Sequence, residues 1–279
     1  MQPITDEQGN YHTPPRRVFF LARRWPTLFY YTEFLTYVLR YSSRAKRGVF
    51  GAEEWWQSSL LSMQGLEKVG VQVEVTGANH LHQVAGPCVL VANHMSTLET
   101  ICLPAVVEPY KECTFIVKRG IAEYPIFKHI ILSREPIVVD RTNPREDLQV
   151  VLEEGSKALA KGRSVVVFPQ TTRTLTLDPE HFNSIGIKLA KRANVPVVPV
   201  ALKTDAWGIG TMIKEFGRID PTKKVHMAFG APLTIEGRGA TEHKQIIDFI
   251  QERLQAWQAS PSPQMTTRAA EEAHALPSH

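Results

Sequence analysis

From residue 71 onward the chain alternates between short runs of β-forming residues and amphipathic helical stretches, and this alternation constrains the fold most strongly. Strands that alternate with helices build a mostly parallel sheet with helices on both faces. Ligands of such folds usually bind beyond the carboxyl ends of the strands. We therefore predict an α/β fold with a central, mostly parallel sheet flanked by helices. Strands are expected at Val71–Thr76, Pro87–Ala92, Cys113–Val117, Pro136–Val139, Ser164–Phe168, Val195–Leu202 and Val225–Phe229.

The chain divides into three parts by pattern. Residues 71–258 carry the strand–helix alternation, with helices predicted over 147–161, 184–192 and 241–257, and we interpret them as one α/β domain. Residues 1–70 precede the alternation and are read as an N-terminal amphipathic helical segment. Residues 259–279 turn to Ser, Pro, Thr and Ala without an apolar period, which predicts a disordered tail.

The N-terminal segment has its own charge and its own apolar stripe. Residues 16–47 contain eight basic residues and one acid, so their net charge exceeds the +4 of the whole chain. An apolar stripe with aromatic residues and Arg-rich flanks is typical of a helix that lies in a lipid interface. A helical hairpin that only covers the domain fits the same pattern, and both interpretations stay open. The helix predicted over 27–41 places four apolar side chains together: Leu28, Tyr31, Leu35 and Val38.

Composition argues against several classes. The longest apolar stretch, residues 25–39, contains Glu33 and a proline and is too short for a transmembrane helix. The first ten residues are polar, which predicts no secretory signal. Cys88, Cys102 and Cys113 are scattered, so we expect no disulfide framework and a reducing compartment. The mild net charge gives no reason to expect a nucleic-acid partner.

A histidine at the end of a buried strand is the first candidate for chemistry. His94 follows the strand at 87–92, and a helix expected from about Ser96 places Glu99 in its first turn, within reach of the imidazole. A carboxylate on one ring nitrogen fixes the tautomer and leaves the other nitrogen free to accept a hydroxyl proton. Ser96-x-x-Glu99 is also a capping box, so a structural role for Glu99 stays open. A zinc site is disfavoured, because no third ligand lies nearby at a usable spacing.

Two further strand ends carry cations. The strand at 164–168 stops at a proline and leads into a hydroxyl-rich loop that presents Arg173, whose planar guanidinium suits a phosphate. Lys118 follows the strand at 113–117 and adds a second positive charge at the same sheet edge. Each cation alone is equally typical of a solvated surface. Three polar sites at three strand ends of one domain indicate a shared binding site.

These blocks resemble the glycerolipid acyltransferases typified by 1-acylglycerol-3-phosphate acyltransferase. Four blocks occur in that family's order over roughly residues 70–235. Asn93-His94 with Glu99 is similar to the family's Asn-His-x4-Asp motif, and residues 118–125 are similar to the second block. Residues 168–174, Phe-Pro-Gln-Thr-Thr-Arg-Thr, are similar to Phe-Pro-Glu-Gly-Thr-Arg-Ser. Residues 195–200 are similar to the fourth block, a buried strand.

The resemblance implies a role for each matched residue. His94 is the implied general base and Glu99 the acid that orients it. The chain departs from the family at Glu99, where aspartate is usual, and at the Gln-Thr pair that replaces Glu-Gly in the third block. The second change removes a carboxylate and a flexible glycine from the acceptor site, which leaves the acceptor headgroup open. The implied substrate-binding residues are Asn93, Lys118, Gln170, Thr171, Thr172 and Arg173.

The implied reaction moves a fatty acyl group from a thioester, either acyl coenzyme A or acyl carrier protein, to a hydroxyl of a lysophospholipid such as 1-acylglycerol-3-phosphate. A thioester is already activated, so no metal and no other cofactor is expected. Acceptor and product reside in the bilayer, which favours a peripheral enzyme on an anionic surface, at the cytoplasmic face of the cytoplasmic membrane. Two other functions stay open: a thioesterase or lipid hydrolase on the same scaffold, and a non-catalytic membrane-binding adaptor.

Overall fold

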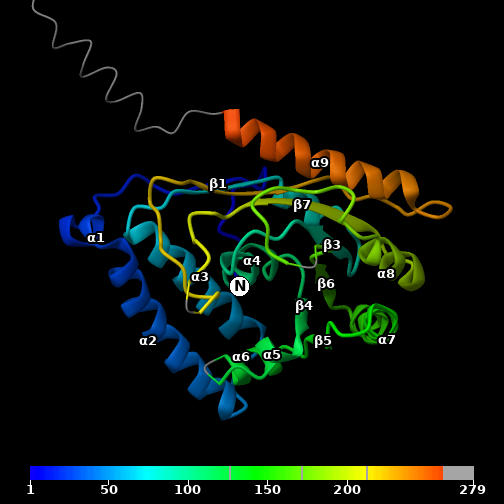
Figure 1. Cartoon of the computed structure of the whole chain (residues 1–279), viewed down its shortest axis with the longest axis horizontal. Helices are drawn as coiled ribbons and strands as arrows, with labels where there is room; N and C mark the ends of the chain where they lie inside the picture. Colours follow the sequence, from blue (N-terminus) through cyan, green and yellow to red (C-terminus); the bar gives the residue numbers. More distant parts are fainter. Residues whose placement is uncertain (126, 171, 212, 260–279) are drawn as a thin grey trace, which may run out of the picture.

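The computed structural model describes residues 1–125, 127–170, 172–211 and 213–259. Within these residues an eight-stranded, mostly parallel sheet forms the centre of the molecule, in the order β1-β2-β8-β7-β3-β6-β4-β5 (Figure 1). The predicted fold class is confirmed, and each predicted strand is present. The additional strand, β1, has two residues and is too short to leave a pattern. The strands are β1 (Tyr11–His12), β2 (Val73–Thr76), β3 (Val89–Ala92), β4 (Cys113–Lys118), β5 (Ile137–Val139), β6 (Ser164–Val167), β7 (Val197–Lys203) and β8 (Val225–Phe229).

The central strands are buried on both faces. In β3, Val89 and Val91 point into one hydrophobic cluster, and Leu90 and Ala92 point into the other. Successive side chains of a strand point to opposite faces, so a strand covered on both sides reads as an unbroken apolar run. The Val-rich sequences of β3, β6 and β7 therefore specify the middle of a three-layer fold.

Each cluster is closed by its own layer of helices. Buried residues of α2, α3 and α4 belong to the first cluster, and those of α7, α8 and α9 to the second. In Figure 1 the two layers lie on either side of the sheet. The α8 helix approaches β3 closely, because a Cβ atom at Gly186 would lie 2.5 Å from a methyl carbon of Val91. The helices are α1 (Phe20–Arg24), α2 (Pro26–Lys46), α3 (Ala52–Lys68), α4 (Leu98–Val107), α5 (Arg119–Ala122), α6 (Lys128–Leu132), α7 (Pro144–Ala160), α8 (Ile185–Ala193) and α9 (Ala240–Ala259), with a short 3₁₀ helix at Ala78–Leu81.

The N-terminal segment is part of the core. The α2 helix buries Tyr30, Phe34, Val38 and Tyr41, and it packs against α3 and α6. The predicted apolar stripe is therefore wrong in part: Val38 faces inward, and the exposed apolar residues of α2 are Leu28, Leu35 and Leu39. These three lie at helical spacing on the opposite face. The α2 helix therefore has two apolar faces, and the sequence pattern alone does not indicate which of them is buried.

The α3 helix is absent from the sequence prediction. Its core-facing side contains Trp55, Ser59, Ser62 and Met63. The two serines interrupt the spacing of apolar residues from which an amphipathic helix is predicted. Residues 260–279, the predicted tail, lie outside the described residues.

The carboxyl ends of five strands open on one edge of the sheet. Pairs β3–β6, β3–β7, β4–β6 and β4–β5 are all parallel. The segments that follow these strands therefore meet at that edge, and they include His94, Lys118, Arg173 and Thr204. The topology places the three predicted polar sites side by side.

Candidate active site

His94 and Glu99 form a hydrogen-bonded pair at the carboxyl end of β3. The imidazole Nδ1 of His94 donates to Oε2 of Glu99. The Glu99 side chain is fully buried, whereas the His94 side chain is 19% exposed and lines a cavity. With Nδ1 engaged in this way, Nε2 is the ring nitrogen left to accept a proton.

The second oxygen of Glu99 holds the start of α4. Oε1 accepts the backbone N–H groups of Met95 (2.7 Å) and Ser96 (2.9 Å), and the hydroxyl of Thr204 donates to the same atom. The Ser96 hydroxyl in turn donates to Thr204 at 3.0 Å. The capping contact and the imidazole contact thus occur together, each through one carboxylate oxygen.

Aromatic and amide groups from the third block fix the position of His94. The ring of Phe168 stacks on the imidazole, with centroids 4.4 Å apart. Gln170 accepts the backbone N–H of His94 at 2.6 Å, and its amide nitrogen donates to the hydroxyl of Thr174. The backbone N–H of Thr174 donates to the His94 carbonyl at 2.9 Å. The loop after β6 therefore holds both backbone groups of the histidine.

Asn93 differs from the role that its motif implies. Its side-chain amide donates to the Leu202 carbonyl at 2.7 Å and its oxygen accepts the Leu202 N–H at 2.8 Å. The residue is buried, and both polar atoms are occupied by the backbone of β7. Asn93 thus joins the ends of β3 and β7 and does not face the cavity.

Arg173 reaches the cavity but is already paired. Its guanidinium donates to the Thr97 hydroxyl at 2.9 Å, to the Lys214 carbonyl at 3.3 Å and to the Glu215 carboxylate at 3.0 Å. The segment after β7 brings Glu215 to this position. That segment folds tightly on itself, because a Cβ atom at Gly217 would lie 1.7 Å from the Gly208 carbonyl oxygen.

The remaining predicted residues line the same cavity or fall outside the structure. Lys118 is exposed at the end of β4, and its ammonium group makes no ion pair in the described part of the chain. Thr172 is exposed and lies on the cavity wall, and Gln170 contributes to the same wall. Thr171 lies outside the described residues.

The cavity has a volume of about 890 Å³, and His94 is among its lining residues. One part of the lining is apolar and comes mainly from α2, α3 and β4. Other lining residues lie at or after the ends of β4 and β5. The apolar part is lined by Phe34, Val38, Trp55, Ser59, Phe115 and Ile130.

A buried ionic cluster ends the apolar part. The guanidinium of Arg134 lies 4.9 Å from the centroid of the Trp55 ring, donates to Glu112 at 3.1 Å and lies 3.6 Å from Glu108. Burial raises the pKa of the Glu108 carboxyl to about 7. The aromatic rings of Phe168, Phe115 and Trp55 follow one another from His94 to this cluster.

Several of these residues have weak sequence signals. Thr204 directly follows β7, and the strand-end rule that selects His94 would select it too. Glu215 has no such signal, because it meets Arg173 across 42 positions from the middle of a long connection. Among the described residues, no group of three His, Cys, Asp or Glu side chains has an arrangement that could hold a metal ion.

Comparison with known proteins gives one consistent result. Residues 72–203 match the family model described as Acyltransferase. Over 233 residues the chain is 26% identical to the 1-acyl-sn-glycerol-3-phosphate acyltransferase of Pseudomonas aeruginosa. The aligned residues cover 84% of this chain and 82% of that protein. It is 27% identical over 153 residues to the protein of the same name from Saccharomyces cerevisiae, covering 54% and 49% of the two chains.

A solved structure has the same fold. The crystal structure of the 1-acyl-sn-glycerophosphate acyltransferase from Thermotoga maritima superposes with a TM-score of 0.65 and 20% sequence identity. The match covers 85% of this chain and 96% of that chain.

Proposed function

We propose that the protein, whose residues 72–203 match the acyltransferase family model, transfers a fatty acyl group from a thioester to a hydroxyl of a lysophospholipid, with His94 as general base. The observation that carries the proposal is the His94–Glu99 pair: a buried carboxylate on Nδ1 and a cavity on the other side of the ring. The acceptor class follows the relatives, which are named for action on 1-acyl-sn-glycerol-3-phosphate.

The proposed reaction needs one base and no covalent enzyme intermediate. Nε2 of His94 removes the proton of the acceptor hydroxyl, and the resulting alkoxide attacks the thioester carbonyl. Collapse of the tetrahedral intermediate breaks the carbon–sulfur bond, and the imidazolium returns its proton to the departing thiolate. The Glu99 carboxylate stabilises the positive ring between these two steps.

Arg173 and Lys118 supply the positive charge for an acceptor phosphate. Both line the cavity that contains His94, and Arg173 is positioned by Thr97 from the α4 side. A guanidinium presents donors in a fixed fork that matches phosphate oxygens. Thr172 adds an exposed hydroxyl on the same wall.

The apolar part of the cavity fits an acyl chain. Its walls come from α2, α3, β4 and α6, and an apolar chain in that space leaves water entirely. A row of aromatic rings in contact leads from His94 toward Trp55, so a chain that follows them keeps its thioester carbonyl beside the histidine.

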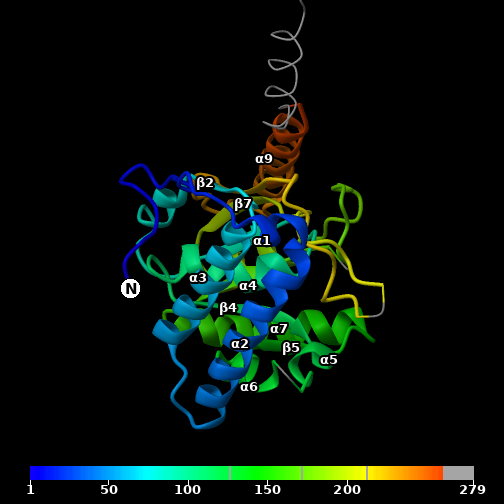
Figure 2. The same ribbon diagram turned by 90° about the vertical axis from the view of Figure 1, so that its left-hand side faces the viewer.

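The outer face of α1 and α2 supports attachment to a membrane surface. Figure 2 shows both helices in front of the rest of the fold. Phe20 is 71% exposed and Leu28 is 60% exposed, and basic residues surround them. No described helix has the length and apolar content of a membrane span. We propose peripheral binding to an anionic bilayer, on the cytoplasmic face in accordance with three buried, unpaired cysteines.

The test uses purified protein, radiolabelled acyl coenzyme A or acyl carrier protein, and a panel of lysophospholipids with the products resolved. Wild-type protein is expected to form a diacyl product. His94→Ala should lower the rate at least about a hundredfold without changing the circular dichroism spectrum. Near-wild-type turnover in that variant would refute the assignment of the base.

The same assay separates the two other functions. A thioesterase would release free fatty acid at the same rate with and without lysophospholipid. A non-catalytic adaptor would consume no thioester at all, although it would still bind vesicles.

A further inference from the structure

A buried guanidinium at the apolar end of the cavity is only partly paired. Arg134 lines the cavity, and its side chain is 7% exposed. Its Nη2 group contacts Glu108 and Glu112, whereas Nε and Nη1 make no hydrogen bond with any described residue. A guanidinium has five N–H donors, and a buried donor without an acceptor costs free energy. Arg134 therefore retains donors that a ligand in the cavity can use.

The hydroxyl of Ser59 is unpaired as well. Three serines of α3 line the cavity, and a serine inside a helix commonly donates to a carbonyl three or four residues earlier. Ser58 and Ser62 do so, to the carbonyls of Trp55 at 2.9 Å and of Ser58 at 2.7 Å. Ser59 is buried, yet its hydroxyl makes no hydrogen bond with a residue that the structure describes. Ser59 therefore offers the cavity both a donor and an acceptor.

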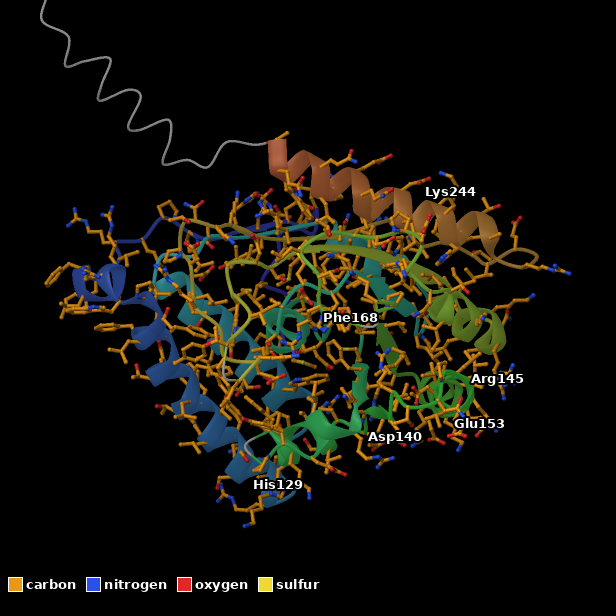
Figure 3. The ribbon with its side chains drawn as sticks, in the orientation of Figure 1. His129, Asp140, Arg145, Glu153, Phe168 and Lys244 are labelled. Carbon is orange, nitrogen blue, oxygen red and sulfur yellow. The ribbon has the colours of Figure 1, made fainter. Side chains whose placement is uncertain are left out.

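Trp55 brings these two residues to the same end of the cavity. Ser59 lies one helical turn after Trp55, so both side chains lie on the same side of α3. The guanidinium carbon of Arg134 lies 4.9 Å from the centroid of the Trp55 ring. In Figure 3 Phe168, the ring stacked on the candidate base, is labelled near the middle of the molecule, and His129, from the α6 helix that precedes Arg134, at its lower edge.

The row of aromatic rings indicates which part of an acyl chain reaches this end. Successive centroids from His94 through Phe168 and Phe115 to Trp55 are 4.4, 6.1 and 5.7 Å apart, and Arg134 follows at 4.9 Å. The path is at most about 21 Å long, which is about eighteen bonds at the extended-chain rise of ~3.5 Å per three bonds. Arg134 is therefore within reach of the distal half of a long acyl chain.

A plain alkyl chain does not satisfy these polar groups. It covers Ser59 and Arg134 with hydrocarbon and displaces the water that could bind them, and each group then lacks a hydrogen-bond partner. A hydroxyl on the chain satisfies both, because its oxygen accepts from the guanidinium and its proton is donated to the serine oxygen. A keto oxygen can only accept. A carboxylate would be repelled by Glu108 and Glu112.

We propose that the enzyme selects acyl donors that carry a hydroxyl in the distal half of the chain, and that Ser59 and Arg134 bind this hydroxyl. This specificity rests on the proposed function, because it concerns the acyl group that is transferred. A site built to hydrogen-bond a substrate hydroxyl discriminates against the analogue that lacks it.

The test compares thioesters of hexadecanoic acid with those of its 3-, 10-, 12-, 14- and 16-hydroxy derivatives, on whichever carrier supports transfer. At least one distal isomer should exceed hexadecanoyl in kcat/KM about tenfold. The 3-hydroxy isomer should not, because its hydroxyl lies beside His94 and far from Arg134. Equal rates for all donors, or the same gain with the 3-hydroxy isomer, would overturn the proposal.

Two variants assign the preference to the named residues. Ser59→Ala removes the hydroxyl without filling the cavity, and Arg134→Lys keeps a positive charge beside Glu108 while removing the unpaired guanidinium donors. Both should reduce the preference for the hydroxylated donor and leave the rate with hexadecanoyl nearly unchanged. Ser62→Ala is the matched control, because the Ser62 hydroxyl already donates to a backbone carbonyl. If Arg134→Lys does not fold, Ser59→Ala decides alone, and a preference that survives it would refute the assignment.

Binding measurements keep this specificity apart from the proposed function. If no lysophospholipid is acylated, the proposed function fails, while thioether analogues of the donor still report on the cavity. Calorimetric titration of wild-type protein with hexadecyl coenzyme A and with the hydroxyhexadecyl analogues should show one distal isomer binding about tenfold more tightly. Hydroxylated analogues that bind no more tightly than the hexadecyl compound would overturn the site.

Discussion

The carboxylate of Glu99 holds the His94 imidazole with one oxygen and the backbone that leads into α4 with the other. Oε2 accepts the Nδ1–H of His94, and Oε1 accepts the N–H groups of Met95 and Ser96 and the hydroxyl of Thr204. From the sequence, catalytic partner and capping acid are alternatives. In the structure one buried carboxylate does both, so the position of the helix start and the tautomer of the histidine depend on the same group.

Glu99→Gln separates the two tasks. The glutamine oxygen retains the N–H donors of Met95 and Ser96, so its amide nitrogen faces His94 and donates to Nδ1. The imidazole then carries its proton on Nε2 and cannot act as the base. We expect kcat to fall at least about a hundredfold with a nearly unchanged melting temperature. Glu99→Asp keeps the charge and is the control; a fully active Glu99→Gln would leave Glu99 a capping residue.

Glu215→Gln tests the competition for Arg173. In the absence of substrate the guanidinium donates to Glu215 at 3.0 Å, and an acceptor phosphate has to share or displace that contact. Removing the negative charge should therefore lower the acceptor KM several-fold without affecting the donor KM. In an Arg173→Ala background the same substitution should have no effect, as a double-mutant cycle would measure. A raised acceptor KM would show instead that Glu215 positions the arginine.

Ser59→Leu should shorten the acyl chain that the enzyme prefers. Ser59 is buried, lies on the cavity-facing side of α3 and makes room beside Trp55. Leucine at that position fills part of the apolar cavity, so long chains lose space while short ones still fit. The measurement is kcat/KM for a series of acyl donors. Ser58→Leu is the control and should shift the chain-length preference less, because the Ser58 side chain is only half-buried. Equal selectivity in Ser59→Leu and wild type would show that the acyl chain binds elsewhere.

The sequence predicts the sheet and the residues at strand ends well, because both depend on local pattern. Four motif blocks lie in the matched stretch of residues 72–203, and the resemblance to the glycerolipid acyltransferases is confirmed. What pattern does not give is the partner of a long side chain across the fold. The sequence predicts Arg173 as a phosphate ligand. It does not predict the carboxylate partner Glu215, because the two residues meet only when the segment beyond β7 folds over Arg173.

Residue type alone also does not give the direction of a side chain. Asn93 shares a motif with His94 but turns into the core toward Leu202, since adjacent residues after a strand point to opposite sides. The predicted face of α2 fails for a similar reason. Tyr30 and Leu28 are both apolar and differ by two positions, and only the packing of α2 against α3 and Trp207 decides which of them is buried.

Glu108 should make stability depend on pH. Burial raises the pKa of its carboxyl from 4.5 to about 7. A carboxyl with a raised folded-state pKa contributes stability that is fully present below about pH 4.5 and is lost as the pH rises through about 7. Between pH 5 and 8 the free energy of unfolding of wild type should therefore fall by about 1–3 kcal/mol relative to Glu108→Gln. Urea unfolding at four pH values measures it.

Glu112→Gln is the control for that experiment. Glu112 also bonds Arg134, but its side chain is 46% exposed, so the variant should retain the pH dependence of wild type. Parallel pH profiles for wild type and Glu108→Gln would contradict the assignment.

The last prediction concerns the outer face of α1 and α2. Of the basic residues between 16 and 47, Arg16 and Arg44 are paired with acids. Arg23, Arg24 and Arg40 are exposed and have no ion pair with a described residue. Each basic residue near an anionic bilayer contributes about 1 kcal/mol of binding free energy, screened by salt.

Replacing Arg23, Arg24 and Arg40 with glutamine should therefore weaken flotation with anionic vesicles about a hundredfold at low salt and much less at high salt. Replacing Leu28, Leu35 and Leu39 with serine should remove the salt-insensitive part. Because all six side chains are exposed, the melting temperature should not change. Deleting residues 1–47 would not serve as a test, since it removes Tyr30 and Phe34 from the core.

The matched control neutralises Lys188, Lys191 and Arg192, three exposed basic residues of α8 in the opposite helix layer. Both α2 variants should lose activity on acceptor embedded in vesicles and keep it on a soluble short-chain analogue, because only the first substrate requires the enzyme to reach the bilayer. If the α8 variant loses flotation as much as the α2 charge variant does, the attraction belongs to the net charge of the protein, and α1 and α2 do not form the docking surface.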